Sequence, residues 1–204
     1  MDKDWLGELI KRRRTRKPTN FHTEVCFSII TKLIDQARYA PNHYRTEPAR
    51  FYLLNRNLIT KVAQIVGHFI RGDGTDITLN EKAKRKEKEW NSATGLLVIT
   101  CYTDSELELF SKIKNLAEEN YAATCCIIQN LLLLFEASGI SAKWSTAQVW
   151  QQPDFESVIG IQYPGKEKVV GFIFYGYSDE ELRYRSLSPL HEQMIDYSNS
   201  PQIR

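Results

Sequence analysis

The chain has 204 residues, of which 42% are hydrophobic, 25% charged and 11% aromatic. This composition is typical of a globular protein with one hydrophobic core, and it excludes disordered, collagen-like and fibrous classes. The formal net charge is only +2, so the overall charge does not indicate a nucleic-acid-binding protein. We therefore expect one domain over residues 1–204.

Cysteine usage and hydropathy bear on the cellular compartment. The four cysteines have no CxxC spacing and lie in apolar runs, which predicts buried free thiols in a reducing cytosol; they are Cys26, Cys101, Cys125 and Cys126. The N-terminus has no apolar signal core, and polar residues interrupt the most apolar stretch, 121–140. We expect a cytoplasmic protein that does not span a membrane.

Hydrophobic periodicity and turn residues predict several helices along the chain. Apolar residues recur at helical spacing from Trp5 to about Arg13. A second helix is expected to have Thr23 as its N-cap and to stop before Pro41. Further helices are predicted over residues 58–70, 105–116, 119–138 and 154–159. The highly charged segment 80–90 fits either a solvated helix or a mobile lid.

Short apolar runs predict three or four β-strands, at residues 51–54, 96–101, 142–145 and 169–175. The last of these is apolar on both faces, which is typical of a central strand. Together with the helices, these strands predict an α+β fold without an internal repeat. The tail 186–204 is only partly apolar, and we expect it either to stay loose or to dock on a partner subunit.

Most familiar chemical motifs are missing from the sequence. It contains no GxGxxG, GxxxxGK[ST], HExxH or GxSxG pattern, which removes the main support for Rossmann, P-loop, zinc-protease and α/β-hydrolase interpretations. The four histidines are widely scattered, so no metal site is predicted.

The sharpest local feature is the basic run 11–17, in which six of seven residues are Lys or Arg. Three interpretations are open: a solvated helix end, a nucleic-acid or targeting patch, and a phosphate clamp. In the third, Arg12, Arg14 and Arg16 alternate on an extended chain and face one side. Spacing alone does not choose among the three.

Several segments, in order, resemble one known family. Arg12-Arg13-Arg14-Thr15-Arg16 is followed a helix later by residues 40–51, Ala-Pro-Asn-His-Tyr-Arg-Thr-Glu-Pro-Ala-Arg-Phe. A long apolar helix with a Gln-Asn pair, a turn and strand at 139–144, a strand at 169–177 and a basic C-terminal element come later. This order is similar to that of the FMN-dependent nitroreductase family, in its small single-domain NAD(P)H nitroreductase branch.

The resemblance implies a nitroreductase-like α+β fold, with a central mixed or antiparallel sheet surrounded by helices, a long core helix and an extended C-terminal tail. It also implies binding roles for particular residues. The FMN phosphate would be held by Arg12, Arg13, Arg14 and Arg16, with Arg183 or Arg185 from the far end. The loop that reaches FMN across a dimer interface would contain Tyr39, Asn42 and His43.

The flavin ring would lie beside Trp144, Ser145 and Thr146, and a backbone N–H of Thr146 or Ala147 would bond its N5. No side chain is predicted to be catalytic, because the cofactor carries the redox chemistry. The implied activity is ping-pong hydride transfer from NADH or NADPH through FMN to an electron-poor acceptor such as a nitroaromatic or a quinone. The implied assembly is a homodimer with FMN at the interface and exchanged C-terminal segments.

The sequence departs from the family pattern at Arg14, Arg45, Glu47 and Ala49, where Ser, Asn, Gln and Trp are usual. Glu47 and Ala49 fall on the loop that flanks the flavin. They motivate a second hypothesis, in which the protein binds FMN or another phosphorylated ligand for storage, sensing or regulation without redox turnover. A third hypothesis is nucleic-acid binding through residues 11–17, against which the negative charge of the rest of the chain argues.

Overall fold

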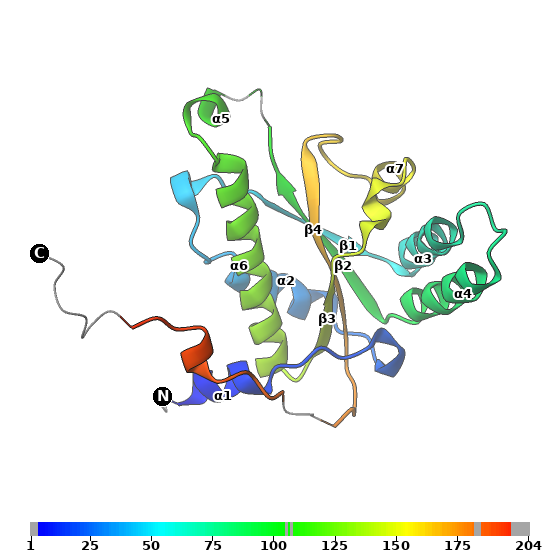
Figure 1. The fold of residues 1–204 in the computed structure, drawn as a ribbon, viewed down its shortest axis with the longest axis horizontal. Helices are drawn as coiled ribbons and strands as arrows, with labels where there is room; N and C mark the ends of the chain where they lie inside the picture. The colour runs from blue at the N-terminus through cyan, green and yellow to red at the C-terminus, as the bar shows by residue number, and fades with distance from the viewer. Residues whose placement is uncertain (1–3, 105, 107, 182–184, 197–204) are drawn as a thin grey trace, which may run out of the picture.

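The structure, a computed structural model, describes residues 4–104, 106, 108–181 and 185–196. Its centre is a four-stranded sheet in the order β1-β2-β4-β3, in which every neighbouring pair is antiparallel (Figure 1). The strands are β1 (Ala49–Leu54), β2 (Gly95–Tyr102), β3 (Ser141–Ser145) and β4 (Glu167–Gly176). All four predicted strands are confirmed, and the predicted strand 169–175 lies in the centre of the sheet.

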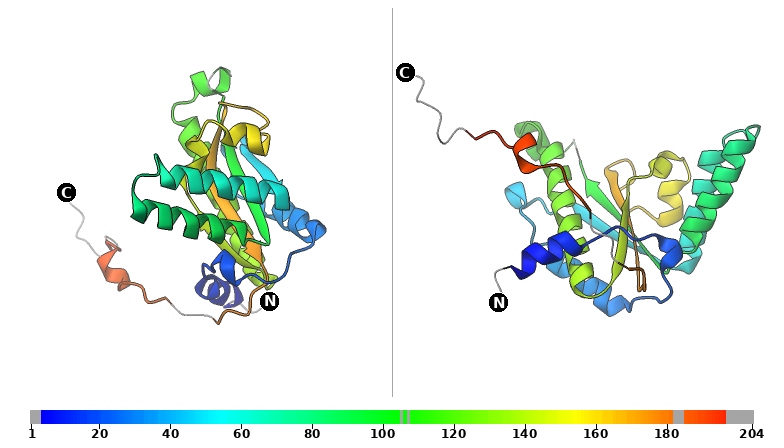
Figure 2. Two further views of the ribbon diagram at one scale, coloured as in Figure 1. Left: turned by 90° about the vertical axis from the view of Figure 1, so that its right-hand side faces the viewer. Right: turned by 60° about the horizontal axis from the view of Figure 1, so that its bottom comes forward.

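Helices cover both faces of the sheet (Figures 1 and 2). One face carries α1 (Trp5–Arg12), α2 (Phe27–Ala37) and α6 (Leu116–Ala137). The other face carries α3 (Arg56–Arg71), α4 (Ile77–Asn91) and α7 (Phe155–Ile159). The short helices are α5 (Glu108–Lys112), η1 (Pro18–Asn20), η2 (His43–Arg45), η3 (Gln148–Gln151) and η4 (Leu190–Glu192).

The hydrophobic core has two halves because the central strands bury both faces. Leu97 and Ile99 of β2 pack with α2 and α6, whereas Leu96 and Val98 pack with α3, α4 and α7. This alternation is the period of two that a strand imposes on its side chains. It explains why β2 reads in the sequence as a continuous apolar run. Among the described residues, no helix is both long and apolar enough to cross a lipid bilayer.

Two helix predictions are wrong in detail. Thr23 does not cap α2, because it lies in a β-bridge with Tyr177 and the helix begins four residues later, at Phe27. The predicted helix 105–116 is reduced to α5, and Asn115 adopts a left-handed conformation that separates α5 from α6. Of that predicted range, Ser105 and Leu107 lie outside the described residues.

The charged segment 80–90 forms most of α4, which packs antiparallel to α3 (Figure 2), so the helix interpretation is confirmed. The prediction that the cysteines are buried is wrong for two of the four. All four cysteines are free, but Cys26 and Cys126 are exposed and only Cys101 is fully buried. Cys126 faces outward because adjacent residues on α6 lie about 100° apart around the helix.

Candidate functional site

The basic run lies along the edge of the sheet. At Arg13 the backbone leaves α1 in an extended conformation, with φ −54° and ψ 124°. Thr15 then forms a parallel bridge with Ala142 of β3, and the backbone N–H of Arg16 donates to the Ala142 carbonyl at 3.0 Å. The arginines are therefore fixed beside the first residues of β3.

A buried carboxylate brings two of these arginines together. Glu136, in the last turn of α6, is 7% exposed. Its Oε1 accepts from Arg12 Nε at 3.2 Å and its Oε2 accepts from Arg16 Nη1 at 2.9 Å. In the sequence, Glu136 is one of the polar residues that interrupt the apolar stretch 121–140, and nothing there marks it as a site residue. Its pairing with the arginines depends on a contact between residues more than 100 positions apart.

Arg12 and Arg16 converge on Glu136, but not by the predicted alternation along an extended chain, because Arg12 is still in α1. Arg14 instead donates from Nη1 to the carbonyl of Arg13 at 2.7 Å. Burial lowers the pKa of the Arg13 guanidinium, and the nearby charges of Arg14 and Arg16 lower it further. Four guanidinium groups beside one carboxylate leave a local excess of positive charge and of N–H donors. This donor set fits a phosphate group.

The predicted ring-binding segment lies further along the same strand. Trp144 Nε1 donates to the Val170 carbonyl at 3.3 Å, and the indole packs against Gly171, where a Cβ would clash with it. Thr146 and Ala147 follow the end of β3 and line a cavity of about 180 Å³. Four residue steps along an extended chain separate Ala142 from Thr146, roughly 13 Å. An elongated ligand with its phosphate at Arg16 would thus run along β3 toward Thr146.

The other predicted loop has a strained backbone. Tyr44, Arg45 and Glu47 have positive φ angles of 55°, 52° and 45°, which residues other than glycine rarely adopt. A hydrogen bond within the loop helps to hold it in place. The Asn42 side-chain oxygen accepts from the Thr46 backbone N–H at 3.0 Å. Such strain persists only where the surroundings enforce it, and it is often found at functional sites.

Contacts with the start of α6 supply that enforcement. Thr46 Oγ1 donates to the buried side-chain oxygen of Asn120 at 2.6 Å, and His43 Nδ1 pairs with the Glu119 carboxylate. Both partners lie in the first turns of α6. The His43 ring also lies against the Tyr44 ring, with centroids 4.1 Å apart.

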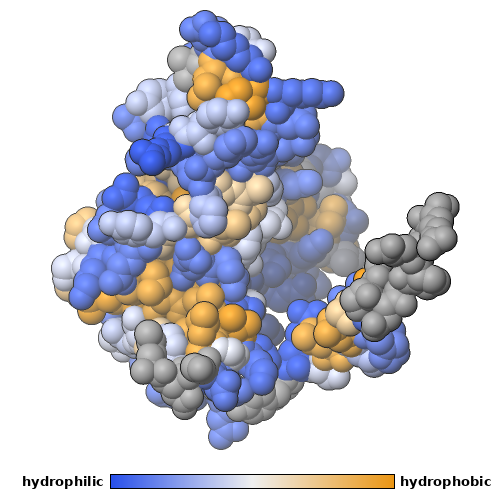
Figure 3. Space-filling model, turned by 90° about the vertical axis from the view of Figure 1, so that its left-hand side faces the viewer, coloured by the Kyte–Doolittle hydropathy of each residue, from blue (hydrophilic) through white to orange (hydrophobic). Residues whose placement is uncertain are grey.

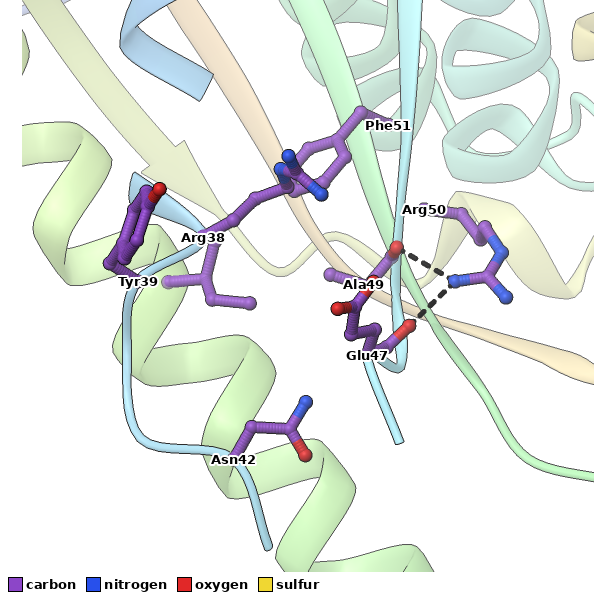
Figure 4. Close-up of a pocket in the computed structure, with 8 residues that line it drawn as sticks. Arg38, Tyr39, Asn42, Glu47, Ala49, Arg50 and Phe51 are labelled. Atoms are coloured by element: carbon purple, nitrogen blue, oxygen red, sulfur yellow. Dashed lines mark hydrogen bonds between the residues drawn. The ribbon is translucent and has the colours of Figure 1, made fainter. Parts of the chain in front are cut away.

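A pocket of about 420 Å³ lies between this loop and β1 (Figure 4). The loop side carries Arg38, Tyr39 and Asn42; the strand side carries Glu47, Ala49 and Phe51. Arg50 turns to the far side of β1, where Nη1 donates to the Glu47 carbonyl at 2.7 Å.

The charges and sizes of these side chains shape the pocket. The hydrogen bond that Arg38 Nη2 donates to Asp35 Oδ1 at 2.5 Å raises the pKa of the Arg38 guanidinium, and the charge of Glu47 adds a smaller effect in the same direction. Ala49 stands where the family usually has Trp, so a small side chain faces the pocket. Arg38 and Phe51 were not among the predicted site residues: no motif singles out Arg38, and Phe51, although it ends the motif 40–51, was given no binding role.

The predicted residues form two groups at opposite ends of α6. The first group is the arginine run, held at Glu136; the Trp144–Ala147 segment leads away from it, and Thr146 and Ala147 line a cavity with Tyr121, near the other end of α6. The second is the Tyr39–His43 loop, held at Glu119. Glu119 and Glu136 are 17 residues apart on one helix, which at roughly 1.5 Å per residue is about 25 Å. One copy of the chain does not bring the two groups together.

The C-terminal residues are placed in part. Arg183 lies outside the described residues. Arg185 is exposed at the start of a tail, residues 185–196, in which every residue is exposed and which projects away from the body of the molecule (Figures 1 and 3). Neither arginine is therefore placed beside Arg12 and Arg16.

Comparison with known proteins places this geometry in a family. The model of the Nitroreductase family matches residues 10–177. YfhC of Bacillus subtilis (strain 168), which carries the name of an NAD(P)H nitroreductase, is 25% identical over 193 residues, covering 94% of this chain and 93% of that protein.

Solved structures share the fold. A nitroreductase-like family protein from Bacillus cereus has a TM-score of 0.76 at 23% identity, over 94% of this chain and 95% of that one. A nitroreductase with bound FMN from Bacteroides fragilis has a TM-score of 0.69 at 18% identity, over 90% and 95%. At these identities the structures show a common fold, and the family match extends from the basic run to the end of β4. The chain belongs to the Nitroreductase family.

Proposed function

We propose that this protein is an FMN-dependent oxidoreductase that transfers hydride from NADH or NADPH to an electron-poor acceptor such as a nitroaromatic or a quinone. The observation that carries the proposal is the position of the arginine run. It lies against β3, the strand that leads to Trp144–Ala147, in a chain that belongs to the Nitroreductase family. In this proposal residues 1–204 form one domain, and the protein acts in the cytoplasm.

The chain's own residues bind and orient the cofactor. Arg12, Arg14 and Arg16 bind the phosphate through charge-assisted hydrogen bonds. The backbone N–H of Thr146 or Ala147 donates to N5 of the flavin ring, and Trp144, fixed by its bond to Val170, lies beside the ring. No side chain needs to act as a nucleophile or general base. When bound, FMN supplies ping-pong hydride transfer, receiving from the nicotinamide and passing reducing equivalents to the acceptor at the same face.

The complete site is formed by two copies of the chain in a homodimer. The Tyr39–His43 loop of one copy reaches the flavin that the arginines and β3 of the other copy hold. Within one chain the arginines and the loop are held about 25 Å apart along α6, at Glu136 and Glu119, which is consistent with this arrangement.

Exposed apolar side chains are available for such an interface. Trp5, Leu6 and Ile10 of α1 are each about half exposed, and Trp5 and Leu6 line a hollow with Leu133 and Leu134 of α6. Figure 3 shows apolar side chains gathered on this face of the molecule and again on the tail. Leu187, Leu190 and Ile195 of the tail are at least 70% exposed, and a partner subunit covers them when C-terminal segments are exchanged.

A visible absorption spectrum of the purified protein tests the function. We expect a yellow protein whose flavin absorbance is lost on addition of NADH or NADPH and restored by a nitroaromatic or a quinone. Bound flavin that neither nucleotide reduces would instead support the non-redox binding protein that Glu47 and Ala49 suggest. A colourless protein that takes up no FMN on reconstitution and retards DNA in a gel would overturn the flavin proposal in favour of nucleic-acid binding.

A further inference from the structure

Glu136 is an unusual residue for its position. A carboxylate in the last turn of a helix is disfavoured by the helix dipole, and a buried charge is costly unless it is paired. Glu136 is nevertheless only 7% exposed, in the last turn of a 22-residue helix whose neighbouring residues are largely apolar. Helix formation alone therefore does not explain why a glutamate lies at this position.

The contacts of Glu136 explain its position. Each carboxylate oxygen accepts from a different arginine, Oε1 from Arg12 and Oε2 from Arg16. Arg12 is the last residue of α1, whereas Arg16 lies on the extended segment against β3. One side chain thus fixes the relative position of two guanidinium groups that come from different local structures.

The pairing leaves most of the donors available. Each guanidinium has five N–H groups. Arg16 uses one on Glu136, and Arg12 uses one on the carboxylate and a second, longer one on the Glu136 carbonyl at 3.5 Å. Within the described part of the chain, the remaining N–H groups of these two arginines have no other partner and can meet a second anion. We propose that Glu136 is a positioning residue that holds Arg12 and Arg16 in the arrangement that binds the flavin phosphate. This inference rests on the proposed function.

The charge of Glu136 considered alone predicts the opposite change in phosphate affinity from the one that a positioning role predicts. The direction of that change therefore tests the proposal. Glu136 reduces the positive charge of the arginine cluster, so on Coulomb's law alone its neutralisation tightens the binding of a phosphate. If Glu136 positions the arginines, its neutralisation weakens that binding. Arg16, whose side chain is 11% exposed, then lacks its buried counter-ion and moves, and Arg12 loses its fixed relation to Arg16.

The experiment compares the binding of FMN and riboflavin, which differ only in the phosphate, to the flavin-free full-length protein. Binding is measured by the change in flavin fluorescence. For Glu136→Gln we expect FMN affinity to fall roughly tenfold while riboflavin affinity stays within about twofold, because the charge-assisted bonds become weaker neutral ones. Glu136→Asp keeps the charge but is one methylene shorter, so it reaches both arginines less well, and we expect a smaller loss of the same preference.

Glu89→Gln is the matched control. Glu89 is also a largely buried carboxylate shared by two cations, Lys86 and Lys143, but it lies between α4 and β3 on the other face of the sheet. We expect it to lower the thermal midpoint as much as Glu136→Gln does, without changing the preference for FMN over riboflavin. This control separates a loss of packing from a loss of positioning.

The outcomes are distinguishable. A lower FMN preference in both Glu136 variants, with Glu89→Gln unchanged, supports the proposal. An unchanged or stronger FMN preference in Glu136→Gln overturns it and leaves the proposed function intact. If the Gln variant does not fold, Glu136→Asp is decisive, since charge counting predicts no change for it. A wild-type protein that binds neither flavin, or binds both equally, overturns the phosphate clamp and the inference together.

Discussion

The arginines of residues 12–16 differ in what holds them, although the sequence presents them as one run. Arg12 and Arg16 share Glu136, Arg13 is half-buried with a lowered pKa, and Arg14 donates to a backbone carbonyl. Their contributions to phosphate binding are therefore expected to differ, since preorganised donors bind better than donors that must be ordered on binding.

We predict that Arg12→Ala and Arg14→Ala both weaken FMN binding, and that Arg12→Ala has the larger effect. Loss of a charge-assisted hydrogen bond at Arg12 lowers affinity roughly ten- to a hundredfold, and loss of Arg14 lowers it severalfold. Titration of flavin-free protein with FMN measures both, and Lys32→Ala, an exposed cation on α2, is the control. Unchanged affinity in both arginine variants would refute the phosphate clamp.

At this scale the sequence identified candidate residues but not their partners. Arg12 and Arg16 are recognisable from their spacing and from their order relative to the Ala-Pro loop. Glu136 is not recognisable in the same way, because a single acidic residue in an apolar helix has no pattern. Its contacts with the arginines follow from the packing of the last turns of α6 against α1, which is a tertiary contact.

At the scale of elements, the Glu89 carboxylate links α4 to the edge strand β3. Glu89 Oε1 accepts from Lys143 Nζ of β3 at 2.5 Å, and Oε2 accepts from Lys86 at 2.6 Å. Burial on its own raises the pKa of Glu89, but the bonds from Lys143 and Lys86 outweigh burial and hold the pKa below its usual value of 4.5. Glu89 therefore stabilises the fold in its ionised form.

We predict that Glu89→Gln lowers the free energy of unfolding by roughly 1 kcal/mol at pH 7. A lowered folded-state pKa gives stability that is present above the unfolded pKa and lost as the pH falls through the folded value. The difference between wild type and variant should thus be constant between about pH 6 and about pH 7 and shrink below about pH 4.5.

Urea unfolding at several pH values measures this difference. Glu108→Gln is the control, because the Glu108–Lys112 pair is exposed on both sides and should contribute little at any pH. A difference between wild type and Glu89→Gln that stays constant below pH 4.5 would mean that the ionised carboxylate is not what links α4 to β3.

The elements themselves were predictable where the local pattern was strong. β2 and β4 are continuous apolar runs, and α3 and α6 have clear helical periodicity, so each was predicted to within three residues of its bounds. The helix 105–116 was not, because the left-handed Asn115 breaks a segment that has helical composition. Thr23 is a good N-cap residue by type, but its backbone forms a β-bridge with Tyr177 instead.

For the whole molecule, the proposed homodimer follows from the distribution of the predicted site residues along α6. The arginines are held at Glu136 and the loop at Glu119, about 25 Å apart by the rise of the helix. In the proposed homodimer, the Glu136 end of α6 in one copy lies near the Glu119 end of α6 in the other. Each flavin then contacts the arginines of one copy and the loop of the other.

We predict that a heterodimer of an Arg12→Ala chain and an Asn42→Ala chain retains one site of wild-type affinity. One of its sites carries both substitutions and the other carries neither, because the two residues come from different copies. The heterodimer is purified through two different affinity tags and titrated with FMN, with each homodimeric variant as a control. If Arg12 and Asn42 served the same site from one chain, each site would carry one substitution and no wild-type affinity would remain.

The sequence by itself determined the class of fold, the family resemblance and the identity of the basic run, because these depend on local periodicity and on the linear order of motifs. Only the tertiary structure decided that Glu136 joins Arg12 to Arg16, that the run lies against β3, and that the loop of Asn42 and the arginines occupy opposite ends of α6. Each of these depends on contacts between residues far apart in the chain, and such contacts are set by how the helices pack across the sheet.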